Sequence, residues 1–173
     1  MLAPADLSRI VIIGNSGSGK SWLAERLANQ LRTPTIDLDE IHWLPGGYQA
    51  RRDPAEARAA VQTHAARDRW IMEGVYGWLV AEALPKATAL LLLDMPDEVC
   101  VANVQARGLR RGGDEASHME LIAWICEYRA RQNSISWIGH AGLFDSFAGP
   151  KLRLRSRAEL AALINVTLDR GIR

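Results

Sequence analysis

The sequence has few cysteines, little net charge and no apolar run long enough to span a bilayer. Its two cysteines, Cys100 and Cys126, lie far apart without a paired histidine, which excludes a zinc knuckle and favours a reducing compartment. The first residues lack the basic and apolar regions of a secretory signal. A net charge of +1 gives no field that attracts nucleic acid or anionic lipid. We therefore expect a cytoplasmic protein without a membrane contact or a stable nucleic-acid complex.

Short apolar strands are expected to alternate with amphipathic helices along the chain. Leucines recur every four residues from Leu23 to Leu31, as in a helix. Further helix starts are predicted at Asp53-Pro54 (for a helix to about residue 67), Asp97, Ser117…Glu120 and Ser156…Glu159. Strands are predicted at 9–13, 35–38, 70–72, 87–94 and 151–155, whereas 133–149 shows no clear pattern. This alternation predicts a single α/β domain over residues 1–173, with a parallel sheet and helices on both faces.

One segment matches the phosphate-binding P-loop pattern without departure: Gly14-Asn15-Ser16-Gly17-Ser18-Gly19-Lys20-Ser21. It follows a predicted buried strand and opens a helix, as the pattern requires. The glycines let successive N–H groups point at phosphate oxygens, and the helix N-terminus adds positive potential. We expect Lys20 to reach the β- and γ-phosphates of ATP and the Ser21 hydroxyl to ligate Mg²⁺.

Signatures of other P-loop classes are missing from the sequence. It contains neither the Asn-Lys-x-Asp guanine reader of GTPases nor the Ser-Gly-Gly-Gln signature of ABC-type ATPases. Asp94 ends the fourth predicted strand and is followed by Met95-Pro96, so no second acid can activate water there, as it does in motor and AAA ATPases. Small-molecule kinases remain, and these need an acceptor site and arginines that neutralise the transferring phosphoryl group.

The chain resembles the nucleoside-monophosphate-kinase-like proteins, specifically the adenylate-kinase-related DNA topology modulation (FlaR-like) group. Besides the P-loop, the matching stretches are 37–47, 70–76, 92–96, Arg107…Arg110-Arg111 and 156–160. The resemblance implies a P-loop NTPase three-layer sandwich with a five-stranded sheet of order 2-3-1-4-5. It also implies an acceptor-binding region at about 38–68 and an arginine-bearing lid. The group's name implies an effect on DNA topology, which no pattern in this sequence supports.

The lid predicted at about 108–117 is short. About ten residues cannot form the separate domain, or the zinc–cysteine site, of long adenylate kinases. This departure puts specificity for AMP in doubt and favours a compact kinase of the shikimate or gluconate type.

Acidic residues follow the predicted strands, at the edge where parallel sheets bind ligands. Asp37 and Asp39 are two residues apart, so one could hold a magnesium-bound water and the other an acceptor hydroxyl. In similar short kinases an aspartate here is the candidate base or substrate anchor, and a carboxylate capping the next segment is the alternative. Glu73 is expected to face the site or to pair with a lid arginine. Asp94 is expected to support Mg²⁺ or to be a structural acid, and the predicted metal site is Ser21, Asp37 and Asp94.

Aromatic and basic residues complete the predicted site. His42, Trp43, Tyr48, Tyr76 and Trp78 could stack on a base or sugar, or pack in the core. Arg107, Arg110 and Arg111 are expected to close over the γ-phosphate, unless they form a solvated helix end. Arg129 and Arg131 are phosphate-clamp candidates. The stretch 155–157, with Arg155 as the predicted contact, borders the adenine ring or caps a helix. The predicted substrate contacts are Asp39, His42, Trp43, Glu73, Tyr76 and Arg129.

These patterns predict an ATP- and Mg²⁺-dependent phosphotransferase that acts on a small acceptor. Catalysis is assigned to Lys20, Asp37, Asp39, Arg107, Arg110 and Arg111. The acceptor is left open, and so is the choice between a monomer and a homodimer. The alternative is a nucleotide-gated regulatory or DNA-associated P-loop ATPase with little transfer activity.

Overall fold

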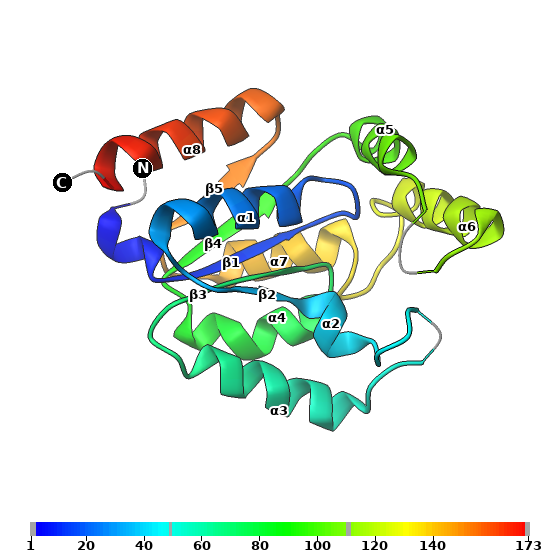
Figure 1. Ribbon diagram of the computed structural model, residues 1–173, viewed down its shortest axis with the longest axis horizontal. Coiled ribbons are helices and arrows are strands. Elements are labelled where there is room, and N and C mark those ends of the chain that lie inside the picture. Colours follow the sequence, from blue (N-terminus) through cyan, green and yellow to red (C-terminus); the bar gives the residue numbers. More distant parts are fainter. Residues whose placement is uncertain (1–2, 49, 110–111, 172–173) are drawn as a thin grey trace.

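A computed structural model describes residues 3–48, 50–109 and 112–171, and it contains five parallel strands in one sheet (Figure 1). The strands are β1 (Arg9–Gly14), β2 (Thr35–Asp37), β3 (Trp70–Gly74), β4 (Ala89–Leu93) and β5 (Lys151–Leu154). Their order is β2-β3-β1-β4-β5, and every neighbouring pair is parallel. The predicted α/β fold and its strand order of 2-3-1-4-5 are therefore confirmed.

Helices cover both faces of the sheet, which gives three layers (Figure 1). The helices are α1 (Lys20–Leu31), α2 (Leu38–His42), α3 (Pro54–Ala65), α4 (Gly77–Ala83), α5 (Asp97–Arg107), α6 (Glu115–Cys126), α7 (Trp137–Ser146) and α8 (Arg157–Gly171), with 3-10 turns η1 (Pro4–Leu7) and η2 (Leu84–Lys86). Alternation along β1 divides the core between the two faces. Ile10 and Ile12 pack with α1, α5 and α8, whereas Val11 and Ile13 pack with α3 and α4.

Several helix boundaries differ from the predictions. Asp97 is the first residue of α5 rather than its cap, and α6 begins earlier than predicted because Asp114 caps it by accepting from the Ser117 amide at 2.9 Å. The unpatterned segment 133–149 contains α7. The predicted cap at Asp53 is confirmed, since its carboxylate accepts from two amides of the first turn of α3. Ser156 likewise accepts from the amide of Glu159 at the start of α8.

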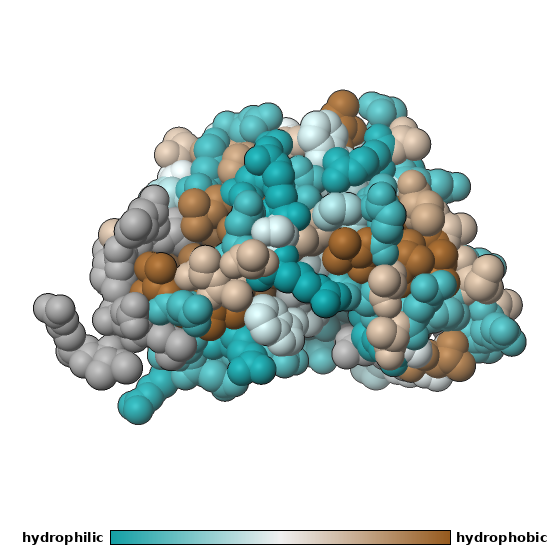
Figure 2. Space-filling view, turned by 90° about the horizontal axis from the view of Figure 1, so that it is seen from above, coloured by the Kyte–Doolittle hydropathy of each residue, from teal (hydrophilic) through white to brown (hydrophobic). Residues whose placement is uncertain are grey.

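The surface shows no broad apolar belt on the face seen in Figure 2, where hydrophilic residues predominate and hydrophobic residues form separate patches. None of the helices in the described ranges is long and apolar enough to cross a bilayer. The single-domain assignment, with an acceptor region at 38–68 and a lid at 108–117, stays a prediction.

Candidate active site

The P-loop connects β1 to α1 and curls tightly under α5. Gly17 has a φ of +76°, in the left-handed region that favours glycine. A Cβ atom at Gly17 would lie 2.3 Å from the Cys100 carbonyl oxygen of α5, so only glycine fits against this helix. The Asn103 side chain of α5 also donates to the Gly17 carbonyl at 2.8 Å. The close contact with α5 fixes the loop in a concave shape that opens at the N-terminus of α1.

The polar groups of the loop suit a bound polyphosphate. Ser18 lines the cavity above the loop, and its buried hydroxyl has no hydrogen-bond partner in the described part of the chain. An orphaned buried hydroxyl is costly unless a ligand satisfies it. Lys20 is also nearly buried, and its ammonium donates to the Asn15 carbonyl at 2.9 Å. The residues Ser16–Ser21 all line the cavity, so the loop fits the triphosphate that its sequence predicts.

Glu73 is the carboxylate that contacts the predicted magnesium ligand. Its side chain is buried at 5% exposure and accepts a hydrogen bond of 2.6 Å from the Ser21 hydroxyl. In the described ranges, no group of three or more His, Cys, Asp or Glu residues is arranged to hold a metal ion. A P-loop Mg²⁺ instead takes one hydroxyl and completes its octahedron with phosphate oxygens and water. The Ser21–Glu73 pair fits such an ion, with Glu73 orienting the hydroxyl that would bind it.

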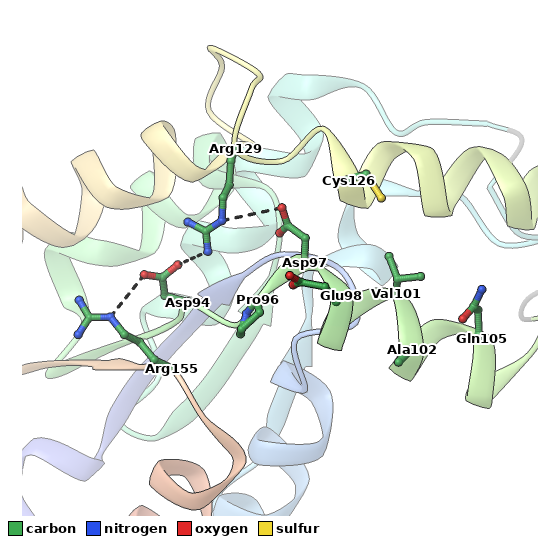
Figure 3. A pocket seen from close by; sticks show the side chains of 10 residues that line it. All are labelled: Asp94, Pro96, Asp97, Glu98, Val101, Ala102, Gln105, Cys126, Arg129 and Arg155. Carbon is green, nitrogen blue, oxygen red and sulfur yellow. Dashed lines mark hydrogen bonds and ion pairs between the residues drawn. The ribbon is translucent and has the colours of Figure 1, made fainter.

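Asp94 has different neighbours, of which Figure 3 shows Arg129 and Arg155. Its carboxylate accepts from Arg129 at 2.8 Å and from the Trp137 indole at 3.2 Å, and Arg155 lies 3.8 Å away. Arg129 also lies 3.8 Å from Asp97. Burial raises the pKa of Asp97, although Arg129 opposes this shift. Asp94 was predicted to support the metal, Arg129 to contact the substrate and Arg155 to border the adenine ring. The structure brings these three residues together as one ion-pair cluster.

The ion-pair cluster borders a cavity of about 770 Å³ on the outer flank of α5 (Figure 3). The P-loop opens instead into a larger cavity of about 1160 Å³, which none of Asp94, Arg129 and Arg155 lines. Arg131, the other clamp candidate, donates to the Trp124 carbonyl and stacks on the Trp124 ring. The roles predicted for these residues in binding Mg²⁺, substrate or adenine stay predictions.

The far end of the large cavity is formed by α2, the loop after it and the β3–α4 turn. Asp37 caps α2, because its carboxylate accepts from the Asp39 amide at 2.8 Å. A helix cap was the predicted alternative to a role of Asp37 in the site. Asp37 caps the helix and also lines the cavity. Asp39 lies beside the Tyr76 hydroxyl, and burial together with this carboxylate raises the pKa of Tyr76 well above its usual value. The Tyr76 hydroxyl accepts from the Trp43 indole at 2.7 Å.

His42 lies between these aromatic rings, with its centroid 4.2 Å from that of Tyr76. Burial, reinforced by the charge of Arg51, lowers its pKa, so His42 is neutral at physiological pH. The predicted contacts Asp39, His42, Trp43, Glu73 and Tyr76 are thus brought to one cavity, together with Tyr48 and Trp78.

The side of the cavity where the lid is predicted is formed by the end of α5 and the start of α6. Arg107, Gly108, Leu109 and Gly113 line it, as do Ser117 and His118 from α6. Arg110 and Arg111, which the sequence assigns to catalysis, lie outside the described residues. Arg107, the predicted lid arginine among the described residues, lines the cavity.

Arg51 and Asn103 also line the cavity, although neither was a predicted contact, and so does Arg157 of the predicted stretch 155–157. Arg51 stacks on Trp43, with its guanidinium 5.4 Å from the ring centroid. Arg157 donates to the Asn103 side chain, so the predicted stretch 155–157 reaches this cavity through Arg157 rather than Arg155. The stretch itself was visible in the sequence, but the direction of each arginine depends on the turn before α8. Nothing in the sequence distinguishes Arg51 from Arg52 beside it.

The sheet order, the P-loop and the cavity beyond it define the fold of the P-loop kinases. Solved structures share this fold along nearly the entire chain. A gluconokinase from Sinorhizobium meliloti 1021 aligns over 96% of this chain and 92% of its own, with a TM-score of 0.57 and 16% identity. The shikimate kinase from Acinetobacter baumannii, solved in complex with shikimate, aligns over 98% of this chain and 97% of its own (TM-score 0.58, 15% identity).

The shikimate kinase from Bacteroides thetaiotaomicron aligns over 94% of this chain and 97% of its own, with a TM-score of 0.53 and 17% identity. No protein-family model matches the sequence. No curated protein matches it either. These similarities show the fold, while the resemblance to the DNA topology modulation group stays a prediction.

Proposed function

We propose that the protein is an ATP- and Mg²⁺-dependent phosphotransferase that acts on a small hydroxyl acceptor. One observation carries this proposal: a single cavity of about 1160 Å³ joins the P-loop to a second set of polar and aromatic residues. A nucleotide on the P-loop would fill one end and leave the other end for an acceptor. A nucleotide sensor has no need of this second end.

The residues at the P-loop have separate roles in this proposal. Backbone N–H groups of Ser16–Ser21 bind the phosphates, and Lys20 turns from the Asn15 carbonyl toward the β- and γ-oxygens. The Ser21 hydroxyl would hold the metal, with Glu73 fixing its direction. Bound MgATP supplies the γ-phosphoryl group, and the metal neutralises part of its charge. Arg107, which lines the same cavity, would stabilise the charge that develops during transfer.

Asp37 and Asp39 are the two candidate bases for the acceptor. Both line the cavity, but the Asp37 carboxylate is already engaged as the cap of α2. The acceptor oxygen forms a bond to the γ-phosphorus while the bond to the β–γ bridging oxygen breaks. The acceptor proton passes to the carboxylate and then to water. The shared fold supports this reading, because the similar structures named above are kinases whose names give hydroxy acids as their substrates.

The test is acceptor-dependent release of ADP from MgATP. The panel includes gluconate, shikimate, nucleosides and nucleoside monophosphates, and Lys20→Ala is the control that removes a phosphate contact. We expect release to depend on one acceptor class and to disappear in Lys20→Ala. ADP release that no acceptor stimulates, but that DNA stimulates, would instead support the regulatory ATPase. A cytoplasmic location and a monomeric or homodimeric state remain further proposals.

A further inference from the structure

The acceptor end of the cavity carries a wall of aromatic side chains. We call this set the aromatic wall; it consists of His42, Trp43, Tyr48, Tyr76 and Trp78. The His42 ring lies 4.8 Å from Trp43 and 5.9 Å from Trp78, and the Trp43 ring lies 5.5 Å from Tyr48. The rings are thus in mutual contact rather than scattered through the core. Tyr48 is 44% exposed and forms the outer edge of the wall.

The aromatic wall is held in place before any ligand binds. Trp43 donates to the Tyr76 hydroxyl, and a short antiparallel bridge pairs the backbones of Trp43 and Arg51. The Arg51 guanidinium lies over the Trp43 ring. A planar ligand would therefore meet fixed aromatic faces and lose little affinity to ordering of the protein.

Negative charge exceeds positive charge at this end. Asp37 and Asp39 line it, and Arg51 is the one arginine or lysine that lines it among the described residues of 37–51 and 73–78. The nearby Arg52 donates to the Ile41 carbonyl, and Arg58 pairs with Glu82 at 3.6 Å. An acceptor that carries a phosphate or carboxylate would face these carboxylates with few cations to offset them.

Among the described residues, few hydrogen-bonding side chains without charge line this end. Besides the tyrosines, the neutral His42 and the tryptophan indoles, the neighbouring loop contributes the amide of Asn133 and the hydroxyl of Ser134. A polyhydroxylated acceptor would leave many of its hydroxyls unpaired against aromatic faces, which is costly. A ligand with one large planar ring and few hydroxyls suits this lining better.

We propose that the phosphate acceptor is an uncharged nucleoside, and this inference rests on the phosphotransferase function proposed above. The base stacks against the aromatic wall, and a sugar hydroxyl lies at Asp37 or Asp39. That hydroxyl oxygen bonds to the γ-phosphorus of ATP and its proton goes to the carboxylate. The products are ADP and a nucleoside monophosphate.

The experiment follows transfer of radiolabelled γ-phosphate from ATP to four acceptor classes. These are nucleosides, nucleoside monophosphates, hydroxy acids and neutral hexoses, each tested with the full chain and MgATP. The expected result is a labelled nucleoside monophosphate formed from a nucleoside. Labelling of another class instead would overturn this inference but leave the phosphotransferase function intact. Binding of ATP without transfer to any class would overturn both.

Two variants test the aromatic wall itself. Tyr48→Leu removes an exposed stacking ring and should raise the KM for the nucleoside about tenfold to a hundredfold, with the KM for ATP unchanged. Leu44→Ala is the matched control, because Leu44 is exposed in the same loop but does not line the cavity. Equal KM values for the nucleoside in Tyr48→Leu and Leu44→Ala would show that the base does not stack on this wall.

Discussion

Replacement of Glu73 by glutamine tests how the P-loop would hold its metal. Glu73→Gln keeps the size of the side chain and removes the negative charge beside the Ser21 hydroxyl. That hydroxyl donates to the carboxylate at 2.6 Å, in a site where Glu73 is only 5% exposed. A hydrogen bond to a charged group contributes about 1.5–3 kcal/mol, and a partner behind a metal ligand is worth about 10–100-fold in metal affinity. The two magnitudes agree, because 1.4 kcal/mol corresponds to about tenfold.

We therefore expect Glu73→Gln to raise the Mg²⁺ concentration for half-maximal transfer by about 10–100-fold. The affinity for ATP measured in the presence of a chelator should stay within about threefold of the wild type, since Lys20 and the backbone amides are unchanged. The assay is a titration of ADP formation with Mg²⁺, alongside nucleotide binding by calorimetry.

Asp94→Asn is the matched control for this substitution. Like Glu73→Gln, it neutralises an acid near the end of a strand next to β1. Asp94, however, pairs with Arg129 and Arg155. It should lower thermal stability and leave the Mg²⁺ titration unchanged. An unchanged titration in Glu73→Gln, or a shifted one in Asp94→Asn, would refute the assignment of Glu73.

Three further substitutions address the phosphates, the lid and the core. Lys20→Ala should remove nearly all transfer while the protein stays folded, because it removes the ammonium that would contact the phosphates; retention of activity would contradict the P-loop assignment. Arg107→Gln should lower kcat about a hundredfold with little change in the KM for ATP; a rise in that KM alone would place Arg107 on the adenine ring. Burial lowers the pKa of His140 to about 4. Between pH 6.5 and 4 the unfolded chain therefore binds a proton at His140 that the folded chain does not. The free energy of unfolding should fall by roughly 3 kcal/mol as the pH drops through that window. Urea unfolding at pH 7, 5 and 4 tests this, and the fall should be smaller in His140→Gln; an equal fall in both proteins would assign the acid sensitivity to other groups.

The P-loop and the strand that precedes it could be predicted from the sequence, because both have strong local patterns. The buried run at β1 and the glycine spacing each restrict the backbone before any tertiary contact forms. Helix α7 could not be predicted. Its sequence is apolar on several sides and includes the fully buried His140, so no single face gives a helical period.

The partner of Ser21 illustrates what the sequence could not determine. Glu73 and Asp94 both lie at the ends of strands that flank β1. In the sheet Glu73 pairs with Ile12, two residues before the end of β1, whereas Leu93 already pairs with Gly14. Asp94 therefore lies beyond the sheet, within reach of Arg129 on the turn after α6. Strand register decided between the two acids, and register is a property of the folded sheet.

The β3–α4 turn serves both ends of the cavity at once. Glu73 reaches the nucleotide end through Ser21, and Tyr76 belongs to the aromatic wall three residues later. Between them, the Val75 carbonyl accepts from His140, whose other ring nitrogen accepts from the buried Tyr128 hydroxyl at 2.6 Å. The lowered pKa keeps His140 neutral, so one ring nitrogen donates to the Val75 carbonyl while the other accepts from Tyr128. The segment 128–140 thus fixes the turn on which both substrates of the proposed reaction depend, so its packing sets their relative position.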